Sequence, residues 1–416
     1  MNQDTKQQAV LLDRSDVRVS HDSGIAATIR SSIDKVRSGD LGSLPVVVGL
    51  VIIWTVFGTL NPTFLSSSNL ANLLFDASTV GIIALGIVCV LMVGEIDLSV
   101  GSISGFASAM VGMLWVNEGW PVALAILAAL VFGGVIGTIY ALLFNRLGMP
   151  SFVSTLAGLL AVLGMQLYLL GATGSINLPY GSGLVNFGQL LVIPRPLAYL
   201  LALVPGAVML FAGFSMVRRR RQANLSTPSV GGLVAKAFAI TVALEFVAFY
   251  LNQDRGIPWM FALFVVLVII MDYALTRTQW GRSMSAVGGN REAARRAGIN
   301  VRMIYTSAFV LCAMFAALGG VLAAARLASA SQQAGTGDVN LNAIAAAVIG
   351  GTSLFGGRGN AYSALLGIIV IQSIASGLTM LDLSSALRYM ITGAVLAIAV
   401  IVDSLARRSR ASHGRG

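Results

Sequence analysis

Two carboxylates, Glu95 and Asp97, stand between two apolar runs in the stretch LMVGEIDLSVGS, residues 91 to 102. In a soluble protein such a pair would suggest an acid–base site or a polar loop. In a lipid bilayer an ionisable side chain is costly, and it usually faces a pore, a partner or a polar cavity. The chemistry open to these two residues therefore depends on whether the chain spans a membrane.

The composition is that of an integral membrane protein. Hydrophobic residues make up 56% of the 416 residues and charged residues only 11%, whereas soluble domains average about 25% charged residues. We expect an all-α polytopic membrane protein with about ten to twelve transmembrane helices, since about 20 apolar residues cross the hydrocarbon core. The apolar runs are 44–60, 78–94, 98–116, 121–144, 151–171, 197–217, 233–252, 259–275, 304–327, 341–356, 361–380 and 388–405.

Two of these runs, 98–116 and 341–356, are short or rich in glycine, and we expect one or both to be broken or re-entrant. Before the first run, Gly94 and Gly101 bracket EIDLSV and weaken a continuous helix, while Asp97 or Ser99 can cap the helix that follows. The pattern predicts a broken helix whose polar groups line a cavity enclosed by protein. An equally weighted alternative is a simple capping turn at the inner interface.

The second glycine-rich element is GGTSLFGGRGN, residues 350–360. Its glycines favour close helix packing and a tight turn. The alternative is that 341–356 is a broken segment with Asn340 and Asn342 at its mouth. The order Asp-Val-Asn at 338–340 resembles Asp-Leu-Ser at 97–99, but this match is too short to establish a repeat.

Orientation follows from the 27 Lys and Arg residues. If the N-terminus is cytoplasmic and each run crosses once, nearly all of them fall on the cytoplasmic side, as the positive-inside rule requires. We therefore expect both termini in the cytoplasm, and the net charge of +10 needs no nucleic-acid partner. The four basic residues placed outside are Arg195, Arg255, Arg326 and Arg388.

The chain divides by composition into three parts. Residues 1–43 form a polar cytoplasmic extension without the apolar core of a signal peptide. Residues 44–405 form the transmembrane domain, which includes a cytoplasmic loop at 276–303, and residues 406–416 form a basic cytoplasmic tail.

The sequence argues against an enzyme. A P-loop ends in Lys followed by Ser or Thr, and the three lysines, at positions 6, 35 and 236, are followed by other residues. Neither GxSxG nor HExxH occurs. The two cysteines lie in apolar runs and the two histidines lie in the terminal tails, so we expect no metal site and no cofactor.

The loop TQWGRSMSAVGGNREAARRAGINVRM, residues 278–303, contains the signals of a short helix. Asn290 is a suitable N-cap, Glu292 lies in the first turn, and Gly298 is a natural stop. We predict about two turns of capped helix at the cytoplasmic face, flanked by glycine hinges, as a docking element for a soluble partner requires. The alternative is a solvated basic loop. The residues concerned are Gly288, Gly289, Asn290, Glu292, Ala294, Arg295, Arg296 and Gly298.

Four stretches in register resemble the permease subunit of bacterial sugar ATP-binding-cassette importers, the ribose, xylose and galactose group. The chain is most similar to the xylose-type permeases. The matching stretches are GEIDLSVGSISG (94–105), LGMPSFVSTLAGLL (147–160), GRSMSAVGGNREAARRAGI (281–299) and AIAAAVIGGTSLFGGRGN (343–360).

The resemblance implies a multi-pass permease of the bacterial inner membrane. It implies two permease copies, two cytoplasmic ATPase subunits and a periplasmic sugar-binding protein. The segment 281–299 matches the loop that docks on the ATPase, and the missing P-loop then belongs to another chain. We expect Glu95, Asp97, Ser99, Asn340 and Asn342 to organise the translocation pathway or its inner gate.

Other functions remain open at this point. Glu245, inside an apolar run, would serve a proton-coupled secondary transporter, although a hydrogen-bonded group facing the helix bundle is the more common situation. A sugar-selective channel is a further alternative. A permease for another polar solute, such as branched-chain amino acids, shares the broad architecture. Xylose is favoured only by the subfamily resemblance.

Overall fold

The computed structural model describes residues 44–394, apart from 224, 226, 228, 385, 388 and 389, together with residue 397. The predicted N-terminal extension and basic tail lie outside this part of the chain, and the predicted run 388–405 lies mostly outside it. In order, the elements are α3 (Leu44–Leu60), α4 (Ser67–Met92), α5 (Val100–Gly112), the π-helix η1 (Met113–Asn117), α6 (Val122–Leu147), α7 (Ser151–Leu170), the 3₁₀ turn η2 (Gly171–Thr173), β1 (Ser175–Asn177), α8 (Gly183–Gln189), α9 (Arg195–Gln222), α10 (Val230–Leu251), α11 (Trp259–Arg277), α12 (Gln279–Gly289), α13 (Arg291–Arg296), α14 (Val301–Leu327), β2 (Ser329–Ser331), α15 (Val339–Ile349) and α16 (Tyr362–Met380).

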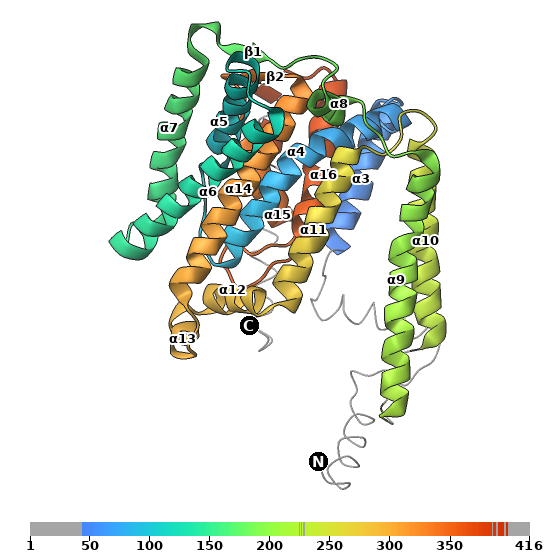
Figure 1. Ribbon diagram of the computed structural model, residues 1–416. Coiled ribbons are helices and arrows are strands. Elements are labelled where there is room, and N and C mark those ends of the chain that lie inside the picture. The colour runs from blue at the N-terminus through green and yellow to red at the C-terminus, as the bar shows by residue number, and fades with distance from the viewer. Residues whose placement is uncertain are drawn as a thin grey trace. The chain divides into compact units, whose positions relative to one another are not determined.

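The fold is the predicted all-α membrane architecture. Nine helices in the described residues are long and apolar enough to cross a membrane. Residues 44–192 and 258–394 form one compact unit, and residues 193–257 form a second. In the larger unit the short helices α12 and α13 lie at one end, and β1, β2 and α8 lie at the other (Figure 1). We call these the α13 end and the β1–β2 end.

Helices α4 and α14 form the centre of the larger unit. In their most apolar 18-residue windows 78% and 72% of the residues are buried, against 22% in α6 and 28% in α7. The two helices run antiparallel, because Gly86 packs against the backbone of Cys312 while Gly319 packs against Thr79 and Ile83. Lipid is as apolar as leucine, so membrane helices associate through small residues that let their backbones approach.

Helix α14 uses the same kind of contact on its other sides. Gly320 lies against the backbone of Ser104 in α5, and Gly133 and Gly137 of α6 lie against the α14 backbone at Ala313 and Phe309. Three helices therefore pack on α14 at distances that exclude side chains. Since α14 follows α13 in the chain, it connects the α13 end to the β1–β2 end through the middle of the unit.

Of the two runs expected to be broken, 98–116 is a continuous helical span that follows an irregular turn, and 341–356 contains a short helix. Helix α4 ends at Met92, residues 93–99 are irregular, and α5 begins at Val100; together with η1, α5 forms an 18-residue candidate span. Helix α15 has only 11 residues, which span about 16 Å, too short for the ~30 Å core. Helix α4 begins at Ser67, earlier than the predicted apolar run at 78–94, because its first three turns are polar but packed.

The strands β1 and β2 form a short antiparallel pair in which Ile176 lies opposite Ala330. A Cβ atom on Gly112, the last residue of α5, would lie 3.2–3.3 Å from these two side chains. The pair therefore fixes the position of the loop that leads from α14 to α15 relative to α5.

The smaller unit is an antiparallel helical hairpin of α9 and α10. Gly206 packs against Thr241, and Gly213 packs against Leu233. The Ser229 hydroxyl caps α10 by accepting a hydrogen bond from Gly232 N, 3.2 Å away. The last turn of α9 carries Arg219, Arg220 and Arg221. Glu245 lies on α10 and is partly buried.

We predict that Gly320→Val destabilises the helix bundle, because its side chain would collide with the backbone of Ser104. Overpacking a core costs ~1–3 kcal/mol, so the apparent melting temperature in detergent should fall by several degrees. Gly164→Val is the matched control, since a Cβ atom at Gly164 meets nothing within 4 Å. Equal melting temperatures for the two variants would contradict this packing.

Candidate functional site

The segment after α11 folds as two short helices. The carboxamide oxygen of Asn290 accepts a hydrogen bond from Ala293 N, 2.9 Å away, and so caps α13. Gly298 adopts a φ of +82°, as expected of a stop signal. On the exposed side, Glu292 pairs with Arg295 at 2.9 Å and with Arg296 at 3.4 Å. The capped helix predicted from the sequence is therefore present.

One part of that prediction is wrong. The sequence suggests a hinge at Gly288 and Gly289, but these are the last two residues of α12, a helix that was not predicted. Only Asn290 separates α12 from α13. Asn290 has an extended backbone conformation, so the chain turns between the two helices, and Gly288 is needed for close packing rather than for flexibility.

Three glycine-containing segments that are far apart in the sequence meet at the α13 end. A Cβ atom on Gly288 would collide with Met92 O and Gly357 N, and one on Gly356 would collide with Gly94. The amide of Gly357 donates a hydrogen bond of 2.9 Å to Met92 O. We call this contact of Met92, Gly94, Gly288, Gly356 and Gly357 the glycine junction. It joins α12 directly to the end of α4 and to the loop after α15.

The positions that turn the chain at the junction also require glycine. Gly94, Gly356 and Gly357 have φ values of +82°, +81° and +75°. Residues with a Cβ atom rarely adopt this left-handed conformation. At Gly356 and Gly357, backbone conformation and close approach therefore restrict the same residue.

Arg291, the first residue of α13, fixes this helix to the membrane bundle. Its guanidinium lies 5.5 Å from the ring centre of Phe144 in α6 and 5.3 Å from that of Tyr305 in α14. Such cation–π contacts contribute ~0.5–2 kcal/mol. The side chain of Trp280 in α12 adds a hydrogen bond of 2.8 Å to Ser307 in α14. Both helices of the segment are thus attached to α14.

Glu95 lies next to this attachment, in the turn after α4. Burial raises the pKa of its carboxyl, while a hydrogen bond with Ser151 and the positive charge of Arg291 act in the opposite direction. The carboxylate therefore lies between the first turn of α7 and the first residue of α13.

Asp97 is completely buried. Its Oδ1 atom accepts hydrogen bonds from the amide of Ser99, at 2.8 Å, and from its hydroxyl, at 2.6 Å. Ser99 occupies the N-cap position of α5 without a capping bond of its own, so the turn is held by Asp97. The Cys312 thiol of α14 faces this carboxyl, while the Oδ2 atom makes no hydrogen bond of normal length within the described residues. A capping turn and a free buried acceptor thus coexist here.

Asn340 and Asn342 lie at the start of α15. The Oδ1 atom of Asn340 accepts a hydrogen bond from Gly101 N in the first turn of α5. The carboxamide of Asn342 donates to Asp338 Oδ2 at 3.0 Å, and its own Oδ1 atom is buried without a partner in the described part of the chain. The sequence analysis predicted that both residues lie at the mouth of a broken segment. In the structure, Asn340 contacts the first turn of α5.

Helix α7 shows how far the loop before α15 extends along the bundle. Ser151 lies at Glu95, Thr155 Oγ1 accepts from Leu98 N at 3.2 Å, and Gln166 donates to Ser331 O at 2.9 Å. From Ser151 to Gln166 is about 22 Å along the helix axis. The loop therefore runs back beside α5, from the β1–β2 end toward the first turn of α5.

Helices α5 and α15 consequently begin at the same place and run in opposite directions. Gly101 in the first turn of α5 touches Asn340 in the first turn of α15, while α15 ends in the loop that reaches the glycine junction. The N-terminus of each helix carries a partial positive charge, and Asp97 is the buried carboxylate beside them. Irregular backbone of this kind is tolerated in a membrane where protein encloses it.

The sequence interpretation missed several of these contacts. Ser151, Thr155 and Gln166 are all buried polar residues on one helix. The spacing of four between Ser151 and Thr155 is a signal that places both on the same face. Arg291 was counted only as one basic loop residue, and nothing in its neighbours indicates the two aromatic rings that it contacts.

Comparisons with known proteins agree with this architecture. The family described as "Branched-chain amino acid transport system / permease component" matches residues 69–400. The xylose transport system permease protein of Escherichia coli (strain K12) is 34% identical over 366 residues, which cover 87% of this chain and 90% of that protein. The xylose transport system permease protein of Haemophilus influenzae is 31% identical, with coverages of 89% and 98%. The ribose import permease protein of E. coli K12 is 28% identical, with coverages of 86% and 92%.

No solved structure matches the chain. The family match spans most of the membrane domain, including the turn after α4, α12, α13 and α15. The chain is therefore a membrane permease of the family of branched-chain amino acid transport system permease components, and it resembles the sugar permeases of ATP-binding-cassette transporters.

Proposed function

We propose that the chain is the membrane subunit of an ATP-binding-cassette importer for a monosaccharide, with D-xylose as the first substrate to test. The observation that carries the proposal is the glycine junction. It connects helices α12 and α13, which lie at the end of the membrane bundle, to the turn after α4 and to the loop after α15. The similarity to xylose and ribose permeases over most of the chain supports a sugar as substrate.

The proposal assigns the remaining parts of the importer to other chains. ATP hydrolysis takes place in cytoplasmic ATPase subunits, since this sequence has no P-loop. A second copy of the permease completes the membrane pair, and a periplasmic binding protein delivers the sugar. The transporter lies in the bacterial inner membrane with both termini of this chain in the cytoplasm. The chain itself is not an enzyme.

Coupling follows from the close contacts of α12 and α13 with the membrane bundle. A partner that moves these helices displaces Gly288, and the displacement is transmitted to Met92 and Gly357 because no flexible side chain lies between the three backbones. The turn at 93–99 and the loop at 350–360 then shift together. Arg291 carries the same movement to α6 and α14 through its contacts with Phe144 and Tyr305.

The pathway lies where α5 and α15 begin. Three buried acceptors there or nearby, Asp97 Oδ2, Asn342 Oδ1 and Gln166 Oε1, have no hydrogen-bond partner in the described residues. A sugar presents hydroxyl donors that suit such acceptors. Asp97 Oδ1 and Asn340 Oδ1 already accept hydrogen bonds within the protein. Few acceptors are therefore left for the sugar, so it binds weakly during passage, as its release into the cytoplasm requires.

A branched-chain amino acid is the second candidate substrate, since it appears in the description of the matching family. The two classes are separated by uptake of labelled xylose, ribose and leucine into cells that express the complete transporter. Sugar uptake that requires ATP and the binding protein supports the proposal. Uptake of leucine alone, or uptake that follows the proton gradient without an ATPase, would contradict it.

Helix α13 provides one test of coupling. Ala294→Pro removes the hydrogen bond of 3.0 Å from Ala294 N to Asn290 O and costs ~3 kcal/mol in a helix interior. We expect normal membrane insertion, with sugar uptake and sugar-stimulated ATP hydrolysis reduced at least tenfold. Glu292→Ala is the control and should transport normally, because it removes only the exposed ion pairs with Arg295 and Arg296. Such pairs contribute only ~0–1 kcal/mol. Full coupling in Ala294→Pro would contradict the role of α13.

Asp97 provides a test of the pathway. Asp97→Asn keeps an oxygen that can accept from Ser99 N but removes the charge and the free acceptor. We expect the Asn variant to remain folded and to lose most sugar uptake, while Asp97→Ala also loses thermal stability because a buried amide is left unpaired, at a cost of ~1–3 kcal/mol. Normal uptake by Asp97→Asn, together with a destabilised Ala variant, would show that the residue only caps α5.

A further inference from the structure

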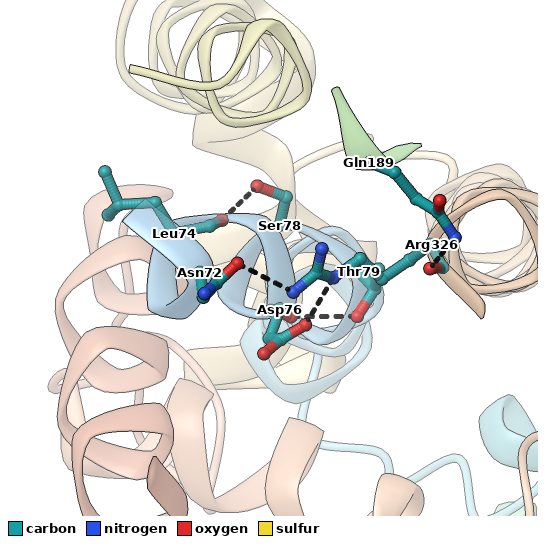
Figure 2. Close-up of polar contacts among 7 residues, drawn as sticks. All are labelled: Asn72, Leu74, Asp76, Ser78, Thr79, Gln189 and Arg326. Carbon is teal, nitrogen blue, oxygen red and sulfur yellow. Dashed lines mark hydrogen bonds and ion pairs between the residues drawn. The ribbon is translucent and has the colours of Figure 1, made fainter. Parts of the chain in front are cut away.

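An ion pair joins α4 and α14 at the β1–β2 end, as Figure 2 shows. Arg326 Nε lies 2.8 Å from Asp76 Oδ1, and Arg326 Nη2 donates to Asn72 Oδ1 at 3.3 Å. The guanidinium also lies 5.0 Å from the ring centre of Phe75. Within the described residues this is the one ion pair that connects two helices, because the others lie inside α13.

The backbone of Arg326 is held as well. Its carbonyl accepts a hydrogen bond of 2.9 Å from the side chain of Gln189 in α8 (Figure 2). The last turn of α14 is therefore bound to α4 through its side chain and to α8 through its carbonyl. A single residue thus connects three helices.

The helices tied here are those whose opposite ends carry the coupling contacts. Helix α4 reaches the glycine junction at Met92, about 24 Å from Asp76 along its axis. Helix α14 begins five residues after α13, at Val301. A movement of α12 and α13 therefore acts on α4 and α14 at one end, while at the other end, beyond the contact of Gly319 with Thr79, the ion pair holds the first turns of α4 to the last turn of α14.

The contact is suited to opening and closing. The side chain of Asp76 is 40% exposed and that of Arg326 is 20% exposed, so water can replace the pair when the end turns of the two helices part. Near Asp76, the hydroxyls of Ser78 and Thr79 donate to the carbonyls of Leu74 and Asp76 at 2.6 and 2.8 Å. Hydroxyls that bond back to the helix backbone favour bending, which allows the first turns of α4 to move.

We propose that Asp76 and Arg326 are positioning residues that hold the first turns of α4 to the last turn of α14 in the resting transporter and so keep ATP hydrolysis low until the binding protein docks. The pair acts through the two helices and touches neither the sugar nor the nucleotide. This inference rests on the proposed function, because it requires an ATPase partner that responds to the state of the permease.

The test measures ATP hydrolysis by the complete transporter, purified with its ATPase subunits and reconstituted in liposomes, with and without sugar-loaded binding protein. Asp76→Asn and Arg326→Gln should raise hydrolysis in the absence of the binding protein at least threefold and reduce its further stimulation. Arg326→Lys, which keeps the charge but loses the second contact to Asn72, should give a smaller rise. The charge-swapped double variant Asp76→Arg/Arg326→Asp should restore a low basal rate.

Controls separate this effect from general damage. Glu118→Gln removes a negative charge from the exposed end of η1 and should leave the basal rate unchanged. A variant that merely misfolds loses hydrolysis, so only a rise supports the inference. Basal rates within twofold of the wild type in both single variants would overturn it while leaving the proposed function intact. A wild-type complex without ATP-driven sugar transport would overturn both.

Discussion

The hydrogen bond from Gly357 N to Met92 O, 2.9 Å long, is made possible by the absence of side chains around it. Gly288 of α12 lies against the same two backbone groups, so that a Cβ atom at this position would collide with both. Through this direct contact of three backbones, the end of α4, the loop after α15 and helices α12 and α13 are held together as one rigid unit. Each of the three segments leads into a different part of the bundle.

The bilayer explains why these parts are built from backbone contacts and buried polar groups. Helices in lipid gain little by burying apolar side chains against one another, so close approach through glycine replaces the hydrophobic effect. The chain is interrupted at 93–99 and at 332–338, and there the freed backbone groups must be satisfied internally. Thr155, Gln166 and Asn340 supply those partners. The same positions leave a few acceptors unpaired, which suits the path proposed for a hydroxylated solute.

Much of this could be predicted from the sequence. Apolar runs identified the membrane helices because a bilayer imposes a minimum length, and the cap residues of α13 identified its first and last turns because capping is local. The start of α4 lies outside the apolar run because its first turns mix polar residues, Asp76 among them, with apolar ones; the partner of Asp76, Arg326, lies 250 positions away. The glycine junction could not be predicted either, since each glycine is locally compatible with an ordinary turn. Only the packed bundle shows that Gly288 is restricted and that Gly289 is not.

The central claim is that α12 drives the membrane segments through backbone contact at Gly288. The most direct measurement compares Gly288→Ala with Gly289→Ala in the reconstituted transporter, by recording sugar uptake per ATP hydrolysed. A Cβ atom at Gly289 meets nothing within 4 Å, whereas one at Gly288 collides with Met92 O and Gly357 N. The account predicts that Gly289→Ala transports normally and that Gly288→Ala assembles with the ATPase but loses most uptake per ATP. Equal coupling in the two variants would contradict it.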